Sequence, residues 1–218
     1  MSMTITARMP PLFSTTPVST SLPDVVVLMG GCPLTQVAVR HFMSSCHDMT
    51  VLSIPDPTAF LALPVQVRQR VTHLFFHPDG LEQGSLLGLC SLSAIRVRCG
   101  WRQRVNILVM SGLPVPQAFA LSSADRVVSD TVSPGTLMMV IALWLRGWRD
   151  RALYTLATPL SAVEIDVLQG LLLGHSPQAV AKHRDRTTKT ISAQKRSALG
   201  KLGAKRMADL LRIQRGGS

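Results

Sequence analysis

The sequence predicts two structural units: a doubly wound α/β unit with a five-stranded parallel sheet, and a small all-α unit of four helices. Short, continuously apolar runs alternate with amphipathic segments between residues 24 and 147, as in parallel strands that helices cover on both faces. After residue 159 no strand-type run remains. The length of 218 residues, 46% of them hydrophobic, is sufficient for two such cores.

These patterns also predict the boundaries of the units. Residues 1–23 are rich in Ser, Thr and Pro, and we expect a disordered tail there. The α/β unit is expected over 24–147, a linker over 148–159, and the helical unit over 160–218.

Five apolar runs are expected to be the strands: residues 24–30, 49–54, 71–77, 105–111 and 125–129. Amphipathic segments predict helices over 34–45 and from Ser133 to about Gly147. A third segment, 58–69, contains Pro64 and is expected to be an irregular helix.

Capping signals organise the helical unit. Ser161 with Glu164 three residues later is a capping box, and Gly174 is expected to end the helix that it begins. Ser176 followed by Pro177 starts a second, short helix. The first helix is expected to bury one apolar stripe, consisting of Val163, Val167, Leu168, Leu171 and Leu172. A third helix is expected from about Thr188 to Gly203 and a fourth over 206–213.

The positive charge is concentrated in the helical unit. The net charge is +11, and residues 160–218 hold eleven Lys and Arg against four Asp and Glu. All five lysines lie beyond residue 181, and no acidic residue lies between Asp185 and Asp209. A basic excess of this kind predicts a polyanionic partner, with an ordinary solvated basic surface as the alternative.

The third helix separates its apolar and cationic residues. Its apolar positions share one face: Ile191, Ala198, Leu199 and Leu202. The opposite face carries small and cationic residues: Lys189, Ser192, Ala193, Arg196 and Gly200. Such a helix fits the major groove, since small residues permit close approach while Arg reads base edges and Lys binds phosphates. We therefore expect a helix-turn-helix that binds double-stranded DNA.

The run LSAVEIDVLQGLLLGHSPQAVAKHRDRTTKTISAQKRSALGKLG (160–203) resembles the LuxR-type helix-turn-helix. The positions that match are Leu160, Ser161, Glu164, Val167, Leu168, Gly174, Ser176, Val180, Ala181, Thr190, Ile191, Lys201, Leu202 and Gly203. Its last part, KTISAQKRSALGKLG, is similar to the Rcs capsule-regulator branch, RcsB and its relatives. Arg184 departs from the pattern, which usually has a buried Leu there.

This resemblance implies that the motif spans roughly residues 177–196. It implies base contacts from Ser192, Ala193 and Arg196, and phosphate contacts from Lys189, Thr190 and Lys195. The full set of expected DNA-binding residues is Thr187, Thr188, Lys189, Thr190, Ser192, Ala193, Gln194, Lys195, Arg196 and Lys201.

The segment DVVVLMGGCPLTQVAV resembles the first strand and turn of a response-regulator receiver domain, where an acidic pair normally follows the strand. Here those positions are Gly30 and Gly31, and His77 stands where the acceptor Asp is expected. Ser111 keeps a hydroxyl group, whereas Ser129 replaces the expected Lys. The resemblance thus implies a degenerate phosphorylation site in a pseudo-receiver.

A site of this composition lacks the carboxylates that hold Mg²⁺ and the Asp nucleophile. We therefore expect a receiver-like unit that aspartyl phosphorylation does not switch. The alternative is a phosphorylation-dependent regulator that uses Asp79, for which capping of the HPDG turn is the favoured role.

One helix-turn-helix makes few base contacts, so a dimer is expected. The apolar helix at 136–148, with Trp144 and Trp148, is either an interface or core packing on the sheet. Resemblance to auxiliary members of the Rcs branch suggests a heterodimer with an RcsB-like protein, and a homodimer is the alternative.

Enzymatic function is not expected, because no Ser/His/Asp, Cys/His or paired-carboxylate constellation follows a predicted strand. An α/β enzyme with a basic appendage is the minor alternative. The four cysteines show no zinc pattern, and we expect no metal and no cofactor. The absence of a signal-peptide pattern, and of an apolar run longer than 137–145, predicts a cytoplasmic protein with no membrane partner.

Overall fold

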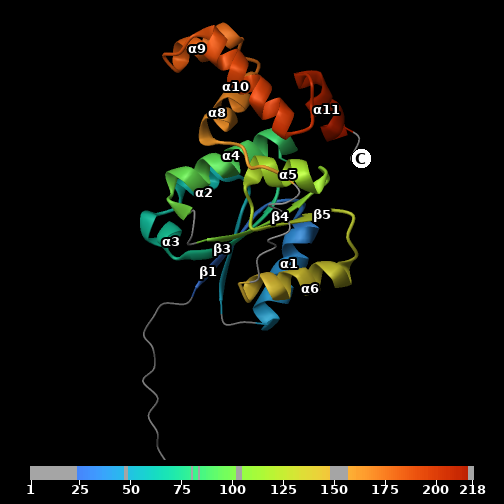
Figure 1. The fold of residues 1–218 in the computed structure, drawn as a ribbon. Helices are drawn as coiled ribbons and strands as arrows, with labels where there is room; N and C mark the ends of the chain where they lie inside the picture. The colour runs from blue at the N-terminus through green and yellow to red at the C-terminus, as the bar shows by residue number, and fades with distance from the viewer. Residues whose placement is uncertain are drawn as a thin grey trace, which may run out of the picture.

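The computed structural model describes residues 24–46, 49–79, 81–82, 84–101, 105–147 and 157–215. The expected tail and most of the expected linker lie outside these residues. Within them the chain forms one sheet with helices on both faces, followed by four further helices (Figure 1).

The sheet has five parallel strands: β1 (Val25–Gly30), β2 (Thr50–Ile54), β3 (Val71–His77), β4 (Asn106–Ser111) and β5 (Arg126–Ser129). Their order is β2-β1-β3-β4-β5. Every residue of β1 and β4 is buried, which explains their uninterrupted apolar character. The predicted doubly wound fold is confirmed.

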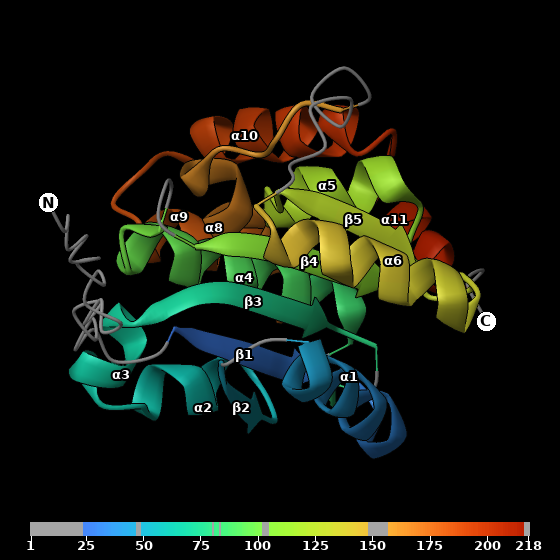
Figure 2. The same cartoon turned by 90° about the horizontal axis from the view of Figure 1, so that it is seen from below.

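Helices α1 (Pro33–Cys46) and α6 (Pro134–Leu145) cover one face of the sheet (Figures 1 and 2). Their contacts centre on Met43 and Trp144, both fully buried beside Phe75 of β3. Helices α2 (Pro57–Ala62), α4 (Ser85–Arg98) and α5 (Val115–Ser122) cover the other face, with α3 (Val65–Gln69) after α2.

The irregular helix expected over 58–69 is two helices. Asp56 caps the first, where its Oδ1 accepts a hydrogen bond from Ala59 N at 2.8 Å. Leu63 and Pro64 then separate α2 from α3, because proline cannot donate the next helical hydrogen bond.

The C-terminal helices are α8 (Ala162–Leu172), α9 (Pro177–His183), α10 (Thr188–Lys201) and α11 (Met207–Arg215). The capping box of Ser161 and the N-cap of Ser176 form as predicted. The predicted stripe of α8 was wrong at Val163, which is 38% exposed, and it omitted Ile165, which is 3% exposed.

The two sets of helices share one hydrophobic cluster. Ile165 and Leu168 of α8 join it from the C-terminal side, and Leu89 and Leu92 of α4 from the sheet side. Polar contacts reinforce this junction: Leu160 N donates to Ala120 O at 2.9 Å, Gln169 Nε2 to Ser91 Oγ at 3.3 Å, and Gln117 Nε2 to Leu202 O at 3.4 Å. The predicted bounds of the two units stay a prediction.

Candidate nucleic-acid interface and the carboxyl edge of the sheet

Helix α10 buries one side and exposes the other. Ile191, Ala198, Leu199 and Leu202 are at most 3% exposed, as the pattern predicted. They lie against α8 and α9, whose Val167 and Val180 pack with Ile191. The burial of this side fixes which residues of α10 face outward.

The outward side carries cationic and small residues. Lys189, Ser192, Ala193 and Arg196 are exposed, and Lys195 is half-buried. Within the described ranges, Lys189, Lys195 and Arg196 have no hydrogen-bond or ion-pair partner in the protein. Their positive charges therefore remain available to an external anion.

The threonines before α10 shape its first turn. Thr187 is the N-cap, and its Oγ1 accepts a hydrogen bond from Thr190 N at 3.2 Å. Thr187 and Thr188 are exposed, while Thr190 and Gln194 are half-buried. The turn that precedes them bends at Asp185, whose φ is 51°. Nine of the ten expected DNA-binding residues thus lie on one continuous stretch, 187–196.

Lys201, the tenth, points into the protein. Its Nζ lies 2.8 Å from Glu164 Oε2 and donates to Pro159 O at 3.5 Å. The ammonium group therefore has partners on the segment that begins α8. This pairing could not be predicted from a local pattern, since the two residues lie 37 positions apart.

Glu164 links the capping box of α8 to α10. Its carboxylate accepts hydrogen bonds from Ser161 N at 2.7 Å, Ser197 Oγ at 2.6 Å and Lys201 Nζ at 2.8 Å. Burial of this carboxyl would raise its pKa, but these donors outweigh it and lower the pKa of Glu164 to about 2. The charged carboxylate thus holds α10 in place on α8.

Arg184, the departure from the family pattern, forms an ion pair instead of a buried apolar contact. Its Nη1 lies 2.8 Å from Asp166 Oδ2, and this links the end of α9 to α8. The substitution therefore replaces one contact between these helices with another.

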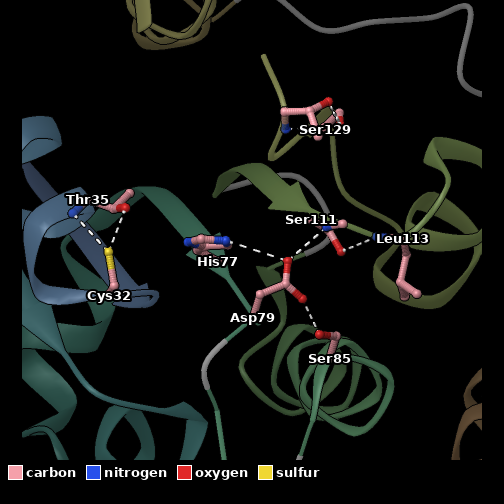
Figure 3. Close-up of polar contacts among 10 residues, drawn as sticks. Cys32, Thr35, His77, Asp79, Ser85, Ser111, Leu113 and Ser129 are labelled. Carbon is pink, nitrogen blue, oxygen red and sulfur yellow. Dashed lines mark hydrogen bonds and ion pairs between the residues drawn. The ribbon is translucent and has the colours of Figure 1, made fainter. Parts of the chain in front are cut away.

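The five residues of the expected degenerate site meet at the carboxyl edge of the sheet. Gly30 pairs with His77 across β1 and β3, and Ser111 pairs with Ser129 across β4 and β5. Gly31 follows directly on β1. Figure 3 shows His77, Ser111 and Ser129, which lie at the ends of the neighbouring strands β3, β4 and β5. The topology thus brings these five positions to one edge of the sheet, while their role as a degenerate phosphorylation site stays a prediction.

His77 fills the space next to the two glycines. A β-carbon on Gly31 would lie 2.7 Å from His77 Nδ1, and one on Gly30 would lie 2.4 Å from His77 O. Both glycines have positive φ, at 77° and 71°. The backbone and His77 together exclude side chains from the positions of the expected acidic pair.

Asp79 connects three segments. Its Oδ2 accepts a hydrogen bond from Gly112 N at 2.8 Å and lies 3.6 Å from His77 Nε2. Its Oδ1 accepts a hydrogen bond from Ser85 Oγ at the start of α4 (Figure 3). Burial opposes ionisation, yet these partners lower the pKa of Asp79 below its ordinary value. Asp79 was expected to cap the HPDG turn. It also contacts Gly112 and Ser85, which lie outside that turn.

The two serines of the edge have local partners. Ser111 Oγ accepts a hydrogen bond from Leu113 N at 3.1 Å, and Ser129 Oγ lies 2.8 Å from Thr131 Oγ1. Among the residues with described positions, no three His, Cys, Asp or Glu side chains are grouped so as to hold a metal ion.

Helix α6 has both buried residues that pack on the sheet and exposed apolar residues. Trp144 is fully buried and its ring packs edge-on against His73, with centroids 5.0 Å apart. Trp148 lies outside the described residues. Met138 and Met139 are 44% and 58% exposed. Core packing thus accounts for Trp144, and the exposed apolar surface comes from the methionines.

Of the helices whose residues are described, none has the length and apolarity needed to cross a bilayer.

No family model and no curated protein matches the sequence. Solved structures do match. RcsB from Salmonella enterica serovar Typhimurium, bound to the promoter rprA in the presence of phosphomimetic BeF3-, is 22% identical with a TM-score of 0.55, over 88% of this chain and 98% of that one. RcsB bound to promoter P1flhDC is 22% identical with a TM-score of 0.56, over 89% and 100%.

A third structure contains two RcsB dimers bound to two parallel DNAs, at 21% identity and a TM-score of 0.54, over 88% of this chain and 99% of that one. At this level of identity the likeness concerns the fold. The chain has the fold of these regulators, in which a receiver-type sheet unit precedes a helix-turn-helix unit.

Proposed function

We propose that this protein is a sequence-specific DNA-binding regulator of transcription that acts as a dimer. The observation that carries the proposal is the outward side of α10, where three unpartnered cations lie beside small side chains. No acidic residue between positions 185 and 209 offsets these charges. A helix buried on one side and cationic on the other is suited to the major groove.

The residues divide into two roles. Ser192, Ala193 and Arg196 lie at the exposed centre of α10 and would contact base edges. Lys189, Thr190 and Lys195 flank them and would contact phosphates, together with Thr187, Thr188 and Gln194. Lys201 is left out of this surface because its ammonium group pairs with Glu164.

Selection of bound fragments from genomic DNA by the full-length protein tests this proposal. We expect enrichment of a common sequence, and a binding constant that falls steeply between about 50 and 200 mM salt as phosphate contacts are lost. Absence of duplex binding at the lower salt concentration would overturn the proposal.

Dimerisation follows from the small number of base contacts that one α10 can make. The RcsB neighbour bound to two parallel DNAs is itself described as dimeric. The partner is a second copy of this chain or an RcsB-like protein, with the exposed methionines of α6 as an apolar contact surface. Light scattering of the protein alone, and of its mixture with RcsB, separates the two arrangements, and a monomer in both samples on operator DNA would exclude both.

The receiver-like unit, in our proposal, makes protein contacts and is not switched by aspartyl phosphorylation. Gly30 and Gly31 supply no carboxylates, and residues 1–181 contain no lysine. Both oxygens of Asp79 are engaged, by Gly112 N and Ser85 Oγ. Incubation with acetyl phosphate and Mg²⁺ should leave the mass unchanged, whereas one added phosphoryl group that Asp79→Asn abolishes would favour the alternative.

A further inference from the structure

A hollow of about 570 Å³ separates the end of α4 from α8 and α9. Arg98, the last residue of α4, lines it from the sheet unit, and Gln169, Leu173 and Val180 line it from the helical unit. Its volume lies within the range of about 300 to 1,000 Å³ of small-molecule sites. None of the proposed DNA-contacting residues lines it.

The charge of this hollow is positive. Arg184 and Asp166, both in the lining, neutralise each other at 2.8 Å. Arg98 is exposed, and no hydrogen bond or ion pair ties it to the described part of the chain. Arg96, two residues earlier, by contrast donates a hydrogen bond to Ser123 O and lies 3.7 Å from Asp125. Arg98 therefore has a guanidinium group free to bind an anion.

The remaining lining combines apolar residues with polar ones, among them His175 and His183. Leu173, Ala179 and Val180 contribute hydrocarbon surface. Gly170 brings α8 close to α9, since a β-carbon there would lie 3.0 Å from Val180 Cγ2. Gln169, held at 3.3 Å from Ser91 Oγ, adds a polar group that is fixed in position. Apolar surface with a few polar groups and one free cation is typical of a site for small organic anions.

We propose that this hollow binds a small organic anion, with its phosphate or carboxylate on Arg98 and its apolar part against Leu173 and Val180. Guanidinium groups recognise both kinds of anion through paired hydrogen bonds. A ligand in this position contacts the sheet unit and the helix-turn-helix unit at once, so it stabilises their packed arrangement. The proposal does not depend on DNA binding.

Calorimetric titration of the full-length protein with four probes tests this site: phenyl phosphate, benzoate, phenol and inorganic phosphate. We expect phenyl phosphate or benzoate to bind and to raise the melting temperature, and phenol and inorganic phosphate to bind much more weakly. The better of the two anions identifies the head group.

Arg98→Gln should weaken this binding about tenfold or more, as expected for loss of a charged hydrogen-bond donor. Arg146→Gln is the matched control, because Arg146 is an exposed arginine at the end of α6 on the other face of the sheet. Equal weakening by both variants, or equal binding of phenol, would overturn the proposal. Competition between a DNA duplex and phenyl phosphate would also overturn it, because the hollow would then be part of the DNA-binding surface.

Discussion

His77 and Gly31 are sterically complementary: a β-carbon on Gly31 would lie 2.7 Å from Nδ1 of the His77 ring. His77 is 9% exposed, so the ring has little room to move aside. The absence of a side chain at position 31 and the histidine ring at position 77 therefore belong to one packing arrangement at this edge. An acidic side chain at position 31 would therefore require the ring of His77 to shift.

Gly31→Asp should lower the free energy of unfolding by about 2 to 4 kcal/mol. The cost combines the positive φ of 77° with the contact to His77. Urea unfolding at neutral pH measures it. Gly135→Asp is the control, because a β-carbon there meets nothing within 4 Å and an acid suits the first turn of α6. Recovery of stability in Gly31→Asp/His77→Ala would identify the ring as the cause, and no recovery would assign the cost to the backbone.

Glu164→Gln should lower the free energy of unfolding by about 2 kcal/mol at pH 7. The value is kept this low because solvent near Lys201 screens the ion pair. The pKa of Glu164 falls from its ordinary 4.5 to about 2 on folding, so its charge contributes stability above about pH 4.5. This contribution disappears as the pH falls from about 4.5 to 2. Urea unfolding measures the difference in the free energy of unfolding between wild type and variant, and this difference should narrow over that pH range. A difference independent of pH would contradict this account.

Asp166→Asn provides the comparison for Glu164. Its partner Arg184 is equally close, at 2.8 Å, but the Asp166 side chain is 52% exposed. Exposed ion pairs contribute little, so this variant should change the unfolding free energy by less than about 1 kcal/mol.

Arg196→Ala should weaken binding to a cognate operator by about 1 to 3 kcal/mol and reduce the preference for that sequence. Lys195→Ala should instead weaken binding to all duplexes and reduce the salt slope by about one unit. Titrations on cognate and scrambled DNA at several salt concentrations distinguish the two effects. If both variants bind like the parent, α10 does not enter the groove.

Cys32 should react with a thiol reagent far faster than Cys90. A hydrogen bond with the Thr35 hydroxyl, at 3.1 Å, lowers the pKa of the exposed Cys32 thiol. Burial raises the pKa of Cys90 to about 12. Mass spectrometry after brief alkylation at pH 8 measures both sites. Thr35→Val should slow the labelling of Cys32, and an unchanged rate would show that the hydroxyl has no part in it.

The sheet unit and the C-terminal helices should unfold together. Leu168→Ala removes a side chain that is 1% exposed in the shared cluster and should cost about 2 to 4 kcal/mol. Tryptophan fluorescence comes from Trp101 and Trp144 of the sheet unit and from Trp148, and the helical unit contains no tryptophan. The unfolding midpoint followed by this fluorescence should shift to lower urea as much as the midpoint followed by helical circular dichroism does. A fluorescence transition at the wild-type midpoint would mean that the units unfold separately.

Local signals predicted the strands and the caps. Ser161 and Ser176 were recognisable because a cap depends on residues within three positions. Helices α4 and α5 were not predicted. Ten of the fourteen residues of α4 are buried, because it lies between the sheet and α8 and so lacks a polar face. The 3.6-residue pattern that identifies surface helices is therefore weak there.

The carboxyl edge was predictable in outline, since parallel strands end at one side of the sheet. The partners of Asp79 were not, because Gly112 is 33 positions away and meets it only in the folded chain. The same reason applies to Lys201, which was placed among the expected DNA-binding residues although its ammonium group pairs with Glu164. Val163 was assigned to the buried stripe by spacing, although it is exposed and Ile165 is buried.

The hydrophobic cluster that joins α8 to α4 affects the design of shorter fragments of this protein. A fragment that begins at residue 157 would keep Leu160, Ile165 and Leu168 but lack the residues of α4 and α5 that complete this cluster, and so would uncover part of it. Apolar surface uncovered in this way favours self-association. A DNA-binding fragment for operator screening should therefore be checked for self-association, although Val167 stays covered because it packs among the C-terminal helices.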